Sequence, residues 1–275
     1  MSITTSQQIA RYYEQFSTVD VTFTKEVIKA TLLYPKQVFM KCLGFQWPCI
    51  VYASSMIGAK LVVNRQGNFS ETVRKANNVI QLRFSFLRPD KADPLTFFVG
   101  AKITGYSPYG PEKPDLTFLT LQYTQRPPDG LIEILGELLE ANVNSQKRKE
   151  ERVTITADSL RKIGIKSKES TVLIQGIPRR GIIRDLSFSG AKVVIFGIAQ
   201  FIVNREAILK LELEEPEELM AIPGKVVRFE PVEGRNDIAA FAIQFVEDQV
   251  PMKYKLRINN YLKTFRVKAA DISDE

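Results

Sequence analysis

The second half of the chain contains the stretch GIIRDLSFSGAKVVIF at residues 181–196. β-Branched residues are frequent at both ends of it, which predicts two strands, over 179–185 and 191–196. Between them stands the pattern Asp-x-Ser-x-x-Gly, which is typical of a turn because Asp and Ser side chains bond the nearby backbone and Gly tolerates a positive φ. The stretch therefore predicts a β-hairpin, and similar strand candidates separated by turn residues recur along most of the chain.

The composition favours a chain with large buried cores. Its 275 residues are 44% apolar and 25% charged, which is enough material for two domains of ordinary size. The absence of histidine excludes His-dependent triads and His-based metal sites, and Cys42 and Cys49 are too few for a disulfide framework or a four-cysteine zinc site. No apolar run reaches the roughly 18 residues of a membrane-spanning helix, and the N-terminus has no signal-peptide pattern, so we expect a cytoplasmic protein.

Positive charge is concentrated in one part of the chain. The formal net charge of the whole chain is +7, and residues 147–192 alone contain 12 basic and 5 acidic residues. This concentration favours an anionic ligand, such as a nucleotide, a nucleic acid or an acidic lipid. A solvated basic surface is the alternative interpretation.

The spacing of apolar residues divides the chain into three parts. Residues 1–141 contain a short helix at 6–16, strand candidates from about 20 to 125, with 30–34 among them, and a helix from 131 to about 142. Residues 142–152 contain one apolar residue and predict a basic linker. Residues 153–275 return to strand candidates and end in a helix. We therefore expect a mainly β chain with two antiparallel barrel-like domains and flanking helices.

Two short patterns frame the start of the second domain. Arg148-x-x-x-Arg152 stands where the linker meets the first strand candidate, and Asp185-x-Ser187-x-x-Gly190 occupies the hairpin turn. Either pattern alone is common. Found together, in this order and among strands, they resemble the signature of the PilZ family of cyclic di-GMP receptors.

A second arginine pair has the same spacing as the first. Arg180 and Arg184 also fit Arg-x-x-x-Arg, but they lie within the strand candidate that leads into the turn. The family places its pair at the entry to the barrel, well before the Asp-x-Ser pattern. We therefore assign the pair to Arg148 and Arg152.

The resemblance implies a role for each residue of the two patterns. Arg148 and Arg152 would clamp a base and a phosphate, because a guanidinium can bond guanine at two atoms and stack on a purine. Asp185 accepts hydrogen bonds, which suits the N–H groups of guanine, and Ser187 can donate or accept. Gly190 would let the ligand approach closely. Further candidates for phosphate contacts are Lys147, Arg179 and Arg180.

The resemblance covers residues 145–263 and implies a PilZ barrel within 153–275. For residues 1–141 it leaves open a second, ligandless PilZ-like barrel or a different split barrel. It implies a non-enzymatic cyclic di-GMP effector without a cofactor, in which the linker changes the arrangement of the two domains on binding. Such an effector would act on a downstream protein partner in motility, adhesion or virulence.

A nucleic-acid-binding module is the alternative function. It would combine the basic stretch 147–192 with aromatic residues of the strand candidates, namely Phe84, Phe86, Phe97 and Phe98. No RNA-recognition motif accompanies them, and the same phenylalanines suit a core. The sequence also contains no glycine-rich phosphate loop with its Lys-Ser/Thr, so an ATP- or GTP-hydrolysing enzyme is not expected.

Overall fold

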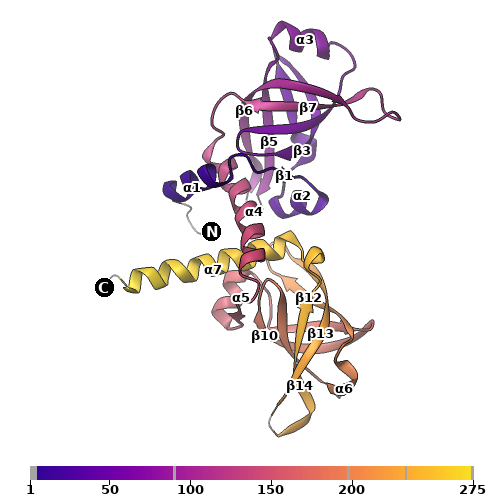
Figure 1. Ribbon diagram of the computed structural model, residues 1–275, viewed down its shortest axis with the longest axis vertical. Helices are drawn as coiled ribbons and strands as arrows, with labels where there is room; N and C mark the ends of the chain where they lie inside the picture. Colours follow the sequence, from indigo (N-terminus) through magenta and orange to yellow (C-terminus); the bar gives the residue numbers. More distant parts are fainter. Residues whose placement is uncertain (1–4, 89–90, 197–198, 233, 274–275) are drawn as a thin grey trace. The chain divides into compact units, whose positions relative to one another are not determined.

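The computed structural model describes residues 5–88, 91–196, 199–232 and 234–273. The chain divides into an N-terminal unit, residues 1–139, and a C-terminal unit, residues 140–275, and the strands of each are visible in Figure 1. The division falls within α4 (Asp129–Lys147). Among the described residues, no helix combines the length and the apolar character needed to cross a membrane.

The N-terminal unit is a closed barrel of six antiparallel strands. Around the barrel the order is β2-β3-β4-β7-β6-β5, with β5 paired back to β2, and the short β1 adds to β3. The bounds are β1 (Val21–Thr22), β2 (Phe39–Cys42), β3 (Phe45–Ser54), β4 (Gly58–Asn64), β5 (Val79–Arg88), β6 (Lys91–Pro108) and β7 (Leu116–Tyr123). Alternate residues of β7 are buried, as expected for a strand with one face on a core.

Helices α1 (Ser6–Phe16), α2 (Lys25–Thr31) and α3 (Phe69–Lys75) accompany this barrel. The expected helix at 6–16 is confirmed, with Thr5 as its N-cap. The strand expected at 30–34 is wrong, because α2 runs through Thr31 and ends at Leu32 in the left-handed conformation. A side-chain cap from Thr24 to the backbone N–H of Val27 favours this helix over the strand.

The C-terminal unit is a second six-stranded antiparallel barrel. Its order is β9-β10-β11-β14-β13-β12, with β12 paired back to β9, and the short β8 adds to β10. The strands are β8 (Val153–Thr154), β9 (Glu169–Ile174), β10 (Ile177–Leu186), β11 (Gly190–Phe196), β12 (Glu206–Leu213), β13 (Glu218–Val232) and β14 (Arg235–Phe245). The helices are α5 (Ala157–Ile163), α6 (Ala199–Ile202) and α7 (Met252–Ser273). The hairpin expected at 181–196 is confirmed as β10 and β11.

The two barrels have the same topology. Each begins with a short strand that pairs with the second barrel strand, continues through a short helix, and closes in the same order of six strands. Each also has a helix between its third and fourth barrel strands and a longer helix after its last strand. Of the two alternatives for the N-terminal domain, the barrel of the same kind is therefore confirmed.

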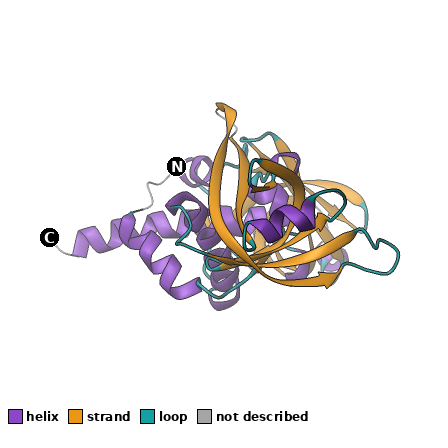
Figure 2. Cartoon of the chain, turned by 90° about the horizontal axis from the view of Figure 1, so that it is seen from above, coloured by secondary structure: helices purple, strands orange, loops and turns teal. Residues whose placement is uncertain are grey.

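The helix α7 packs on the C-terminal barrel. Tyr254 and Ile258 are buried and belong to the same apolar core as the inward side chains of the strands. Figure 2 shows α7 as a continuous helix that leads toward the C-terminus. Burial of this apolar face holds the helix on the barrel.

The expected linker 142–152 is helical as far as Lys147, which corrects the prediction of an irregular segment over its first six residues. Helix α4 continues to Lys147, because Asn144 and Ser145 are buried and Asn144 donates a 2.6 Å hydrogen bond to Asn259 of α7. These polar side chains have partners inside the C-terminal unit, which composition alone does not reveal. Only residues 148–152 lie between α4 and β8.

Candidate functional site

The turn between β10 and β11 is held by its own backbone and by α7. The N–H of Ser187 donates to the carbonyl oxygen of Gly190 at 2.8 Å, and the Ser187 hydroxyl donates to the same oxygen at 3.2 Å. The Tyr254 hydroxyl donates to the Ser187 carbonyl oxygen at 2.7 Å. Because Ser187 is fully buried, its side chain stabilises the turn and does not face solvent.

Gly190 is required by a neighbouring strand. It pairs with Gln244 of β14, and a Cβ atom at position 190 would collide with the Ile243 carbonyl oxygen. Its φ lies outside the left-handed region, which corrects the expectation of a positive φ in this turn. The close contact with β14 therefore explains the glycine without a ligand.

Arg152 and Asp185 come together although 33 residues separate them. Nη1 of Arg152 donates to Oδ1 of Asp185 at 2.6 Å, with 36% and 18% of the two side chains exposed. Strand β8 brings them together, because Thr154 pairs with Asp185 and Arg152 precedes β8. A partly exposed ion pair of this kind contributes little to stability, about 1 kcal/mol or less, so an anionic ligand can compete for the guanidinium.

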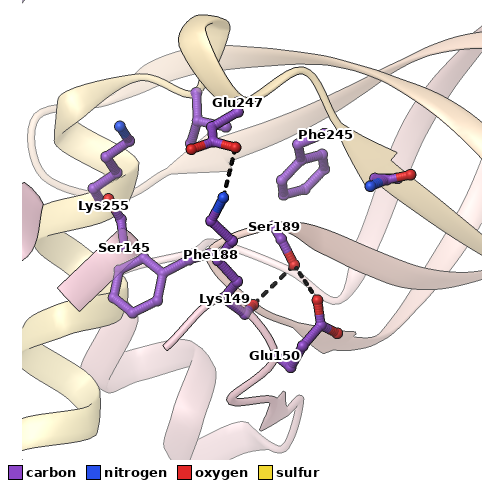
Figure 3. A pocket seen from close by; sticks show the side chains of 10 residues that line it. Ser145, Lys149, Glu150, Phe188, Ser189, Phe245, Glu247 and Lys255 are labelled. Atoms are coloured by element: carbon purple, nitrogen blue, oxygen red, sulfur yellow. Dashed lines mark hydrogen bonds and ion pairs between the residues drawn. The ribbon is translucent and has the colours of Figure 1, made fainter. Parts of the chain in front are cut away.

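The segment before β8 is attached to the turn. The Ser189 hydroxyl lies 2.8 Å from the carbonyl oxygen of Lys149 and 3.2 Å from Oε1 of Glu150 (Figure 3). Nζ of Lys149 also lies 2.7 Å from Oε2 of Glu247, and this ammonium lowers the pKa of the Glu247 carboxyl from its ordinary value. These contacts hold the arginine segment, residues 148–152, against the barrel.

Two small pockets flank the contact between Ser189 and Glu150. The larger has a volume of about 230 Å³. Its lining consists of Glu150, Arg152, Ser189, Gly190, Val227, Arg228, Ala242, Ile243 and Gln244. The smaller, of about 100 Å³, contains two lysines, Lys149 and Lys255, beside the carboxylate of Glu247 (Figure 3). The wall of the larger pocket therefore includes two arginines and one glutamate, and this excess of positive charge is suited to an anion.

The structure brings only some of the sequence-predicted residues to the larger pocket. Arg152 and Gly190 line it, and Asp185 reaches it through its ion pair with Arg152. Arg148 is half-buried directly after α4, with its N–H bonded to the Asn144 carbonyl oxygen, and it lines neither pocket.

The three further candidates fall into two places. Lys147 is exposed at the end of α4. Arg179 and Arg180 lie near the opposite end of β10, where they pair with Val172 and Thr171. At about 3.3 Å per residue, Arg180 is about 16 Å along the strand from Asp185. The structure therefore does not bring Arg179 and Arg180 to the pocket.

Sequence reasoning missed several residues of the pocket wall. Glu150 and Ser189 lie inside the two patterns, so their positions were a signal that went unused. Arg228 and Gln244 belong to β13 and β14, and only the pairing of these strands with the hairpin brings them close. No local pattern in the sequence marks them.

The basic stretch is interrupted by ion pairs with acidic residues. Pairs within the C-terminal unit include Lys149–Glu247, Arg152–Asp185, Arg161–Asp158, Lys166–Glu217 and Lys192–Glu230. Of the phenylalanines considered for nucleic-acid binding, Phe84, Phe86 and Phe97 are buried, while Phe98 is 41% exposed. The stacking surface expected of a nucleic-acid-binding module is therefore largely core.

The N-terminal barrel contains the same turn without the charged residues. Ser55 donates its N–H to the Gly58 carbonyl oxygen at 2.9 Å, and a Cβ atom at position 58 would collide with the Leu121 carbonyl oxygen. Strand register places Ala53 where the C-terminal barrel has Asp185. The serine and the glycine are thus common to both barrels, whereas the carboxylate is specific to the second.

The arginine pair is also specific to the second barrel. Strand β1 pairs with β3 as β8 pairs with β10, so Asp20 takes the place of Arg152 and Phe16 that of Arg148. The first barrel therefore retains the scaffold of the site, but at these three positions it has Phe16, Asp20 and Ala53 in place of the two arginines and the aspartate.

Comparison with known protein families also separates the chain into an N-terminal and a C-terminal domain. Residues 7–142 match the model of the PilZN3 domain, and residues 146–273 match that of the PilZ domain. A Treponema denticola protein named "Cyclic di-GMP binding protein" is 47% identical over 271 residues, which cover 98% of this chain and 86% of the relative.

Two solved structures are also similar. Borreliella burgdorferi PlzA in complex with c-di-GMP is 23% identical, covers 93% of this chain and 98% of its own, and has a TM-score of 0.43. The K. pneumonia MrkH–c-di-GMP complex is 13% identical, covers 97% and 96%, and has a TM-score of 0.31. The identity to the Treponema denticola protein and the two domain matches show that this chain belongs to the PilZ family, with a PilZN3 domain followed by a PilZ domain.

Proposed function

We propose that the protein is a non-enzymatic receptor for cyclic di-GMP and that the ligand binds at the larger pocket of the C-terminal barrel. The proposal rests mainly on the ion pair between Arg152 and Asp185, which lies beside a pocket that Arg228 also lines. The ligand of the Treponema denticola relative, as its name gives it, supports the same assignment.

The residues of the site have distinct roles in this proposal. Arg152 binds phosphate or the edge of guanine, and Asp185 accepts hydrogen bonds from the guanine N–H groups. Arg148 contributes a second guanidinium once the segment around it adjusts. Ser187 and Gly190 keep the turn in shape, because both have counterparts in the first barrel, where the charged groups are missing.

Binding exchanges existing contacts for ligand contacts. The ligand takes the Arg152 guanidinium from Asp185 and pulls on residues 148–152, which continue directly from α4. Since α4 begins in the N-terminal unit, this movement can change the arrangement of the two units. Small-angle scattering with and without saturating cyclic di-GMP tests this step, and identical profiles would contradict it.

Calorimetric titration of the full chain tests the ligand itself. We expect binding of cyclic di-GMP and much weaker binding of GMP and cyclic di-AMP, because Asp185 and the arginines select guanine. Absence of cyclic di-GMP binding would contradict the proposal. Binding of single-stranded nucleic acid of any sequence, falling steeply with salt, would favour the nucleic-acid-binding module instead.

The output we propose is control of motility, adhesion or virulence through a downstream protein partner. A chromosomal Arg152→Ala change then has the same effect on movement and surface attachment as deletion of the gene, while Arg180→Ala leaves both unchanged. A wild-type phenotype of the Arg152→Ala strain, with normal protein abundance, would contradict this output.

A further inference from the structure

One row of residues crosses four strands on the outer face of the C-terminal barrel. Strand register pairs Asp185 with Lys192, Lys192 with Ala242, and Ala242 with Arg228. Directly paired residues of neighbouring strands share a face of the sheet, and adjacent strands lie about 4.8 Å apart. Arg228 is therefore three strand-to-strand steps from Asp185. Ala242 lies next to Arg228 in this row, and because its side chain is small it leaves open space above the sheet; we call Ala242 the floor of the pocket.

The larger pocket lies on this row. Arg152 and Arg228 both contribute to its wall, and the small residues Ala242 and Gly190 also line it. The pairing of β13 with β14 shifts register between Val226 and Arg228, and such a bulge redirects the side chains that follow it. The exposed Arg228 thus borders the pocket together with the arginine of the first pattern.

The charges around Glu230 agree with a position of Arg152 and Arg228 near one another. Lys192 is the main cause that lowers the pKa of the Glu230 carboxyl, through a hydrogen bond and its charge, and the charges of Arg228 and Arg152 add to it. Two guanidinium groups from distant parts of the sequence are therefore close enough to act on the same carboxylate.

The first barrel provides an internal comparison. Its equivalent row is Ala53, Lys60, Thr120 and Gly105, read from the same strand pairings. The lysine and the bulge before the last residue are common to both barrels, whereas the arginine of the second barrel has a glycine as its counterpart. Arg228 is therefore not needed to build a barrel of this topology.

We propose that Arg228 is a further ligand-binding residue, which together with Arg152 holds a phosphate of the bound nucleotide above the floor formed by Ala242. This inference rests on the proposed function. Two guanidinium groups bordering one pocket suit a phosphodiester, because each can donate two hydrogen bonds to its oxygens.

Titration with cyclic di-GMP at constant salt tests the role of Arg228. Arg228→Ala should weaken binding about tenfold or more, the effect expected for loss of a hydrogen bond between charged groups. Arg228→Lys should weaken it less, since the charge remains. Arg180→Ala, which removes an exposed arginine of the same barrel, is the matched control and should leave binding unchanged.

A second pair of variants tests the floor. Ala242→Leu should weaken binding by a similar factor because the larger side chain fills the pocket. Ala240→Leu makes the same change two residues earlier on the same strand and face, outside the pocket lining, and should leave binding unchanged. Circular dichroism of each variant checks that the barrel remains folded.

The outcomes separate this inference from the proposed function. If the wild type does not bind cyclic di-GMP, the proposed function fails and this inference fails with it. If the wild type binds, Arg152→Ala binds poorly and Arg228→Ala binds as well as Arg180→Ala, the proposed function stands and the role of Arg228 is refuted. If the Ala242→Leu and Ala240→Leu proteins bind cyclic di-GMP equally well, the role of Ala242 as the floor of the pocket is refuted.

Discussion

Tyr254 connects α7 to the turn of the candidate site, and its hydroxyl can be removed without disturbing its ring. The hydroxyl donates a 2.7 Å hydrogen bond to the Ser187 carbonyl oxygen. The ring packs edge-on against that of Phe245, with 5.7 Å between the two ring centroids. Burial raises the pKa of Tyr254, so the hydroxyl stays protonated and remains a donor. Tyr254→Phe keeps the ring contact and leaves a buried carbonyl without this partner, which should cost about 1–3 kcal/mol of unfolding free energy.

Guanidinium unfolding measures this loss with an internal reference. Trp47 is the single tryptophan and belongs to the N-terminal unit, so its fluorescence follows that unit, while circular dichroism follows both. In Tyr254→Phe, the part of the circular dichroism change that comes from the C-terminal unit should occur at a lower denaturant concentration. The unfolding transition followed by Trp47 fluorescence should stay at the same concentration. Tyr52→Phe, which removes an exposed hydroxyl, should change neither. An unchanged circular dichroism transition for Tyr254→Phe would refute the role of α7 in holding the turn.

Three further predictions concern the two barrels. Tyr123→Phe removes a 2.8 Å buried hydrogen bond with Ser54. In a denaturant titration followed by Trp47 fluorescence, the unfolding free energy of the N-terminal unit should fall by about 1–2 kcal/mol, and an unchanged value would contradict this. Gly190→Ala forces β11 away from β14 and should cost about 1–3 kcal/mol in the same titration followed by circular dichroism; wild-type stability would contradict the close contact. Lys149→Ala breaks an exposed ion pair and should change the unfolding free energy by less than about 1 kcal/mol, with a larger loss as the contrary result.

The fold was predictable where local patterns agree with tertiary structure. β-Branched runs predicted the strands, and the two hairpin strands at 179–185 and 191–196 lie within or close to β10 and β11. The helix α2 was missed because it has only seven residues, three of them β-branched, and the Thr24 cap outweighs their low helix propensity. The extension of α4 was missed because its polar residues are satisfied by α7, a contact between distant parts of the sequence.

The candidate site was predictable only as far as its two sequence patterns reach. Arg152 and Asp185 were named from the sequence and meet in the structure. Gly190 was correctly singled out, but the carbonyl of a neighbouring strand explains it as well as a ligand does. Arg228 and Ala242 could not be found, because strand pairing alone brings them to the pocket.

The most direct measurement of the central claim is the dissociation constant of cyclic di-GMP for Arg152→Ala compared with that for Arg180→Ala. Both variants lose one arginine of the C-terminal barrel, and only Arg152 lines the pocket and pairs with Asp185. We predict that Arg152→Ala binds about 10- to 100-fold more weakly than the wild type and that Arg180→Ala binds like the wild type. Equal affinity of the two variants would contradict the assignment of the ligand to this pocket.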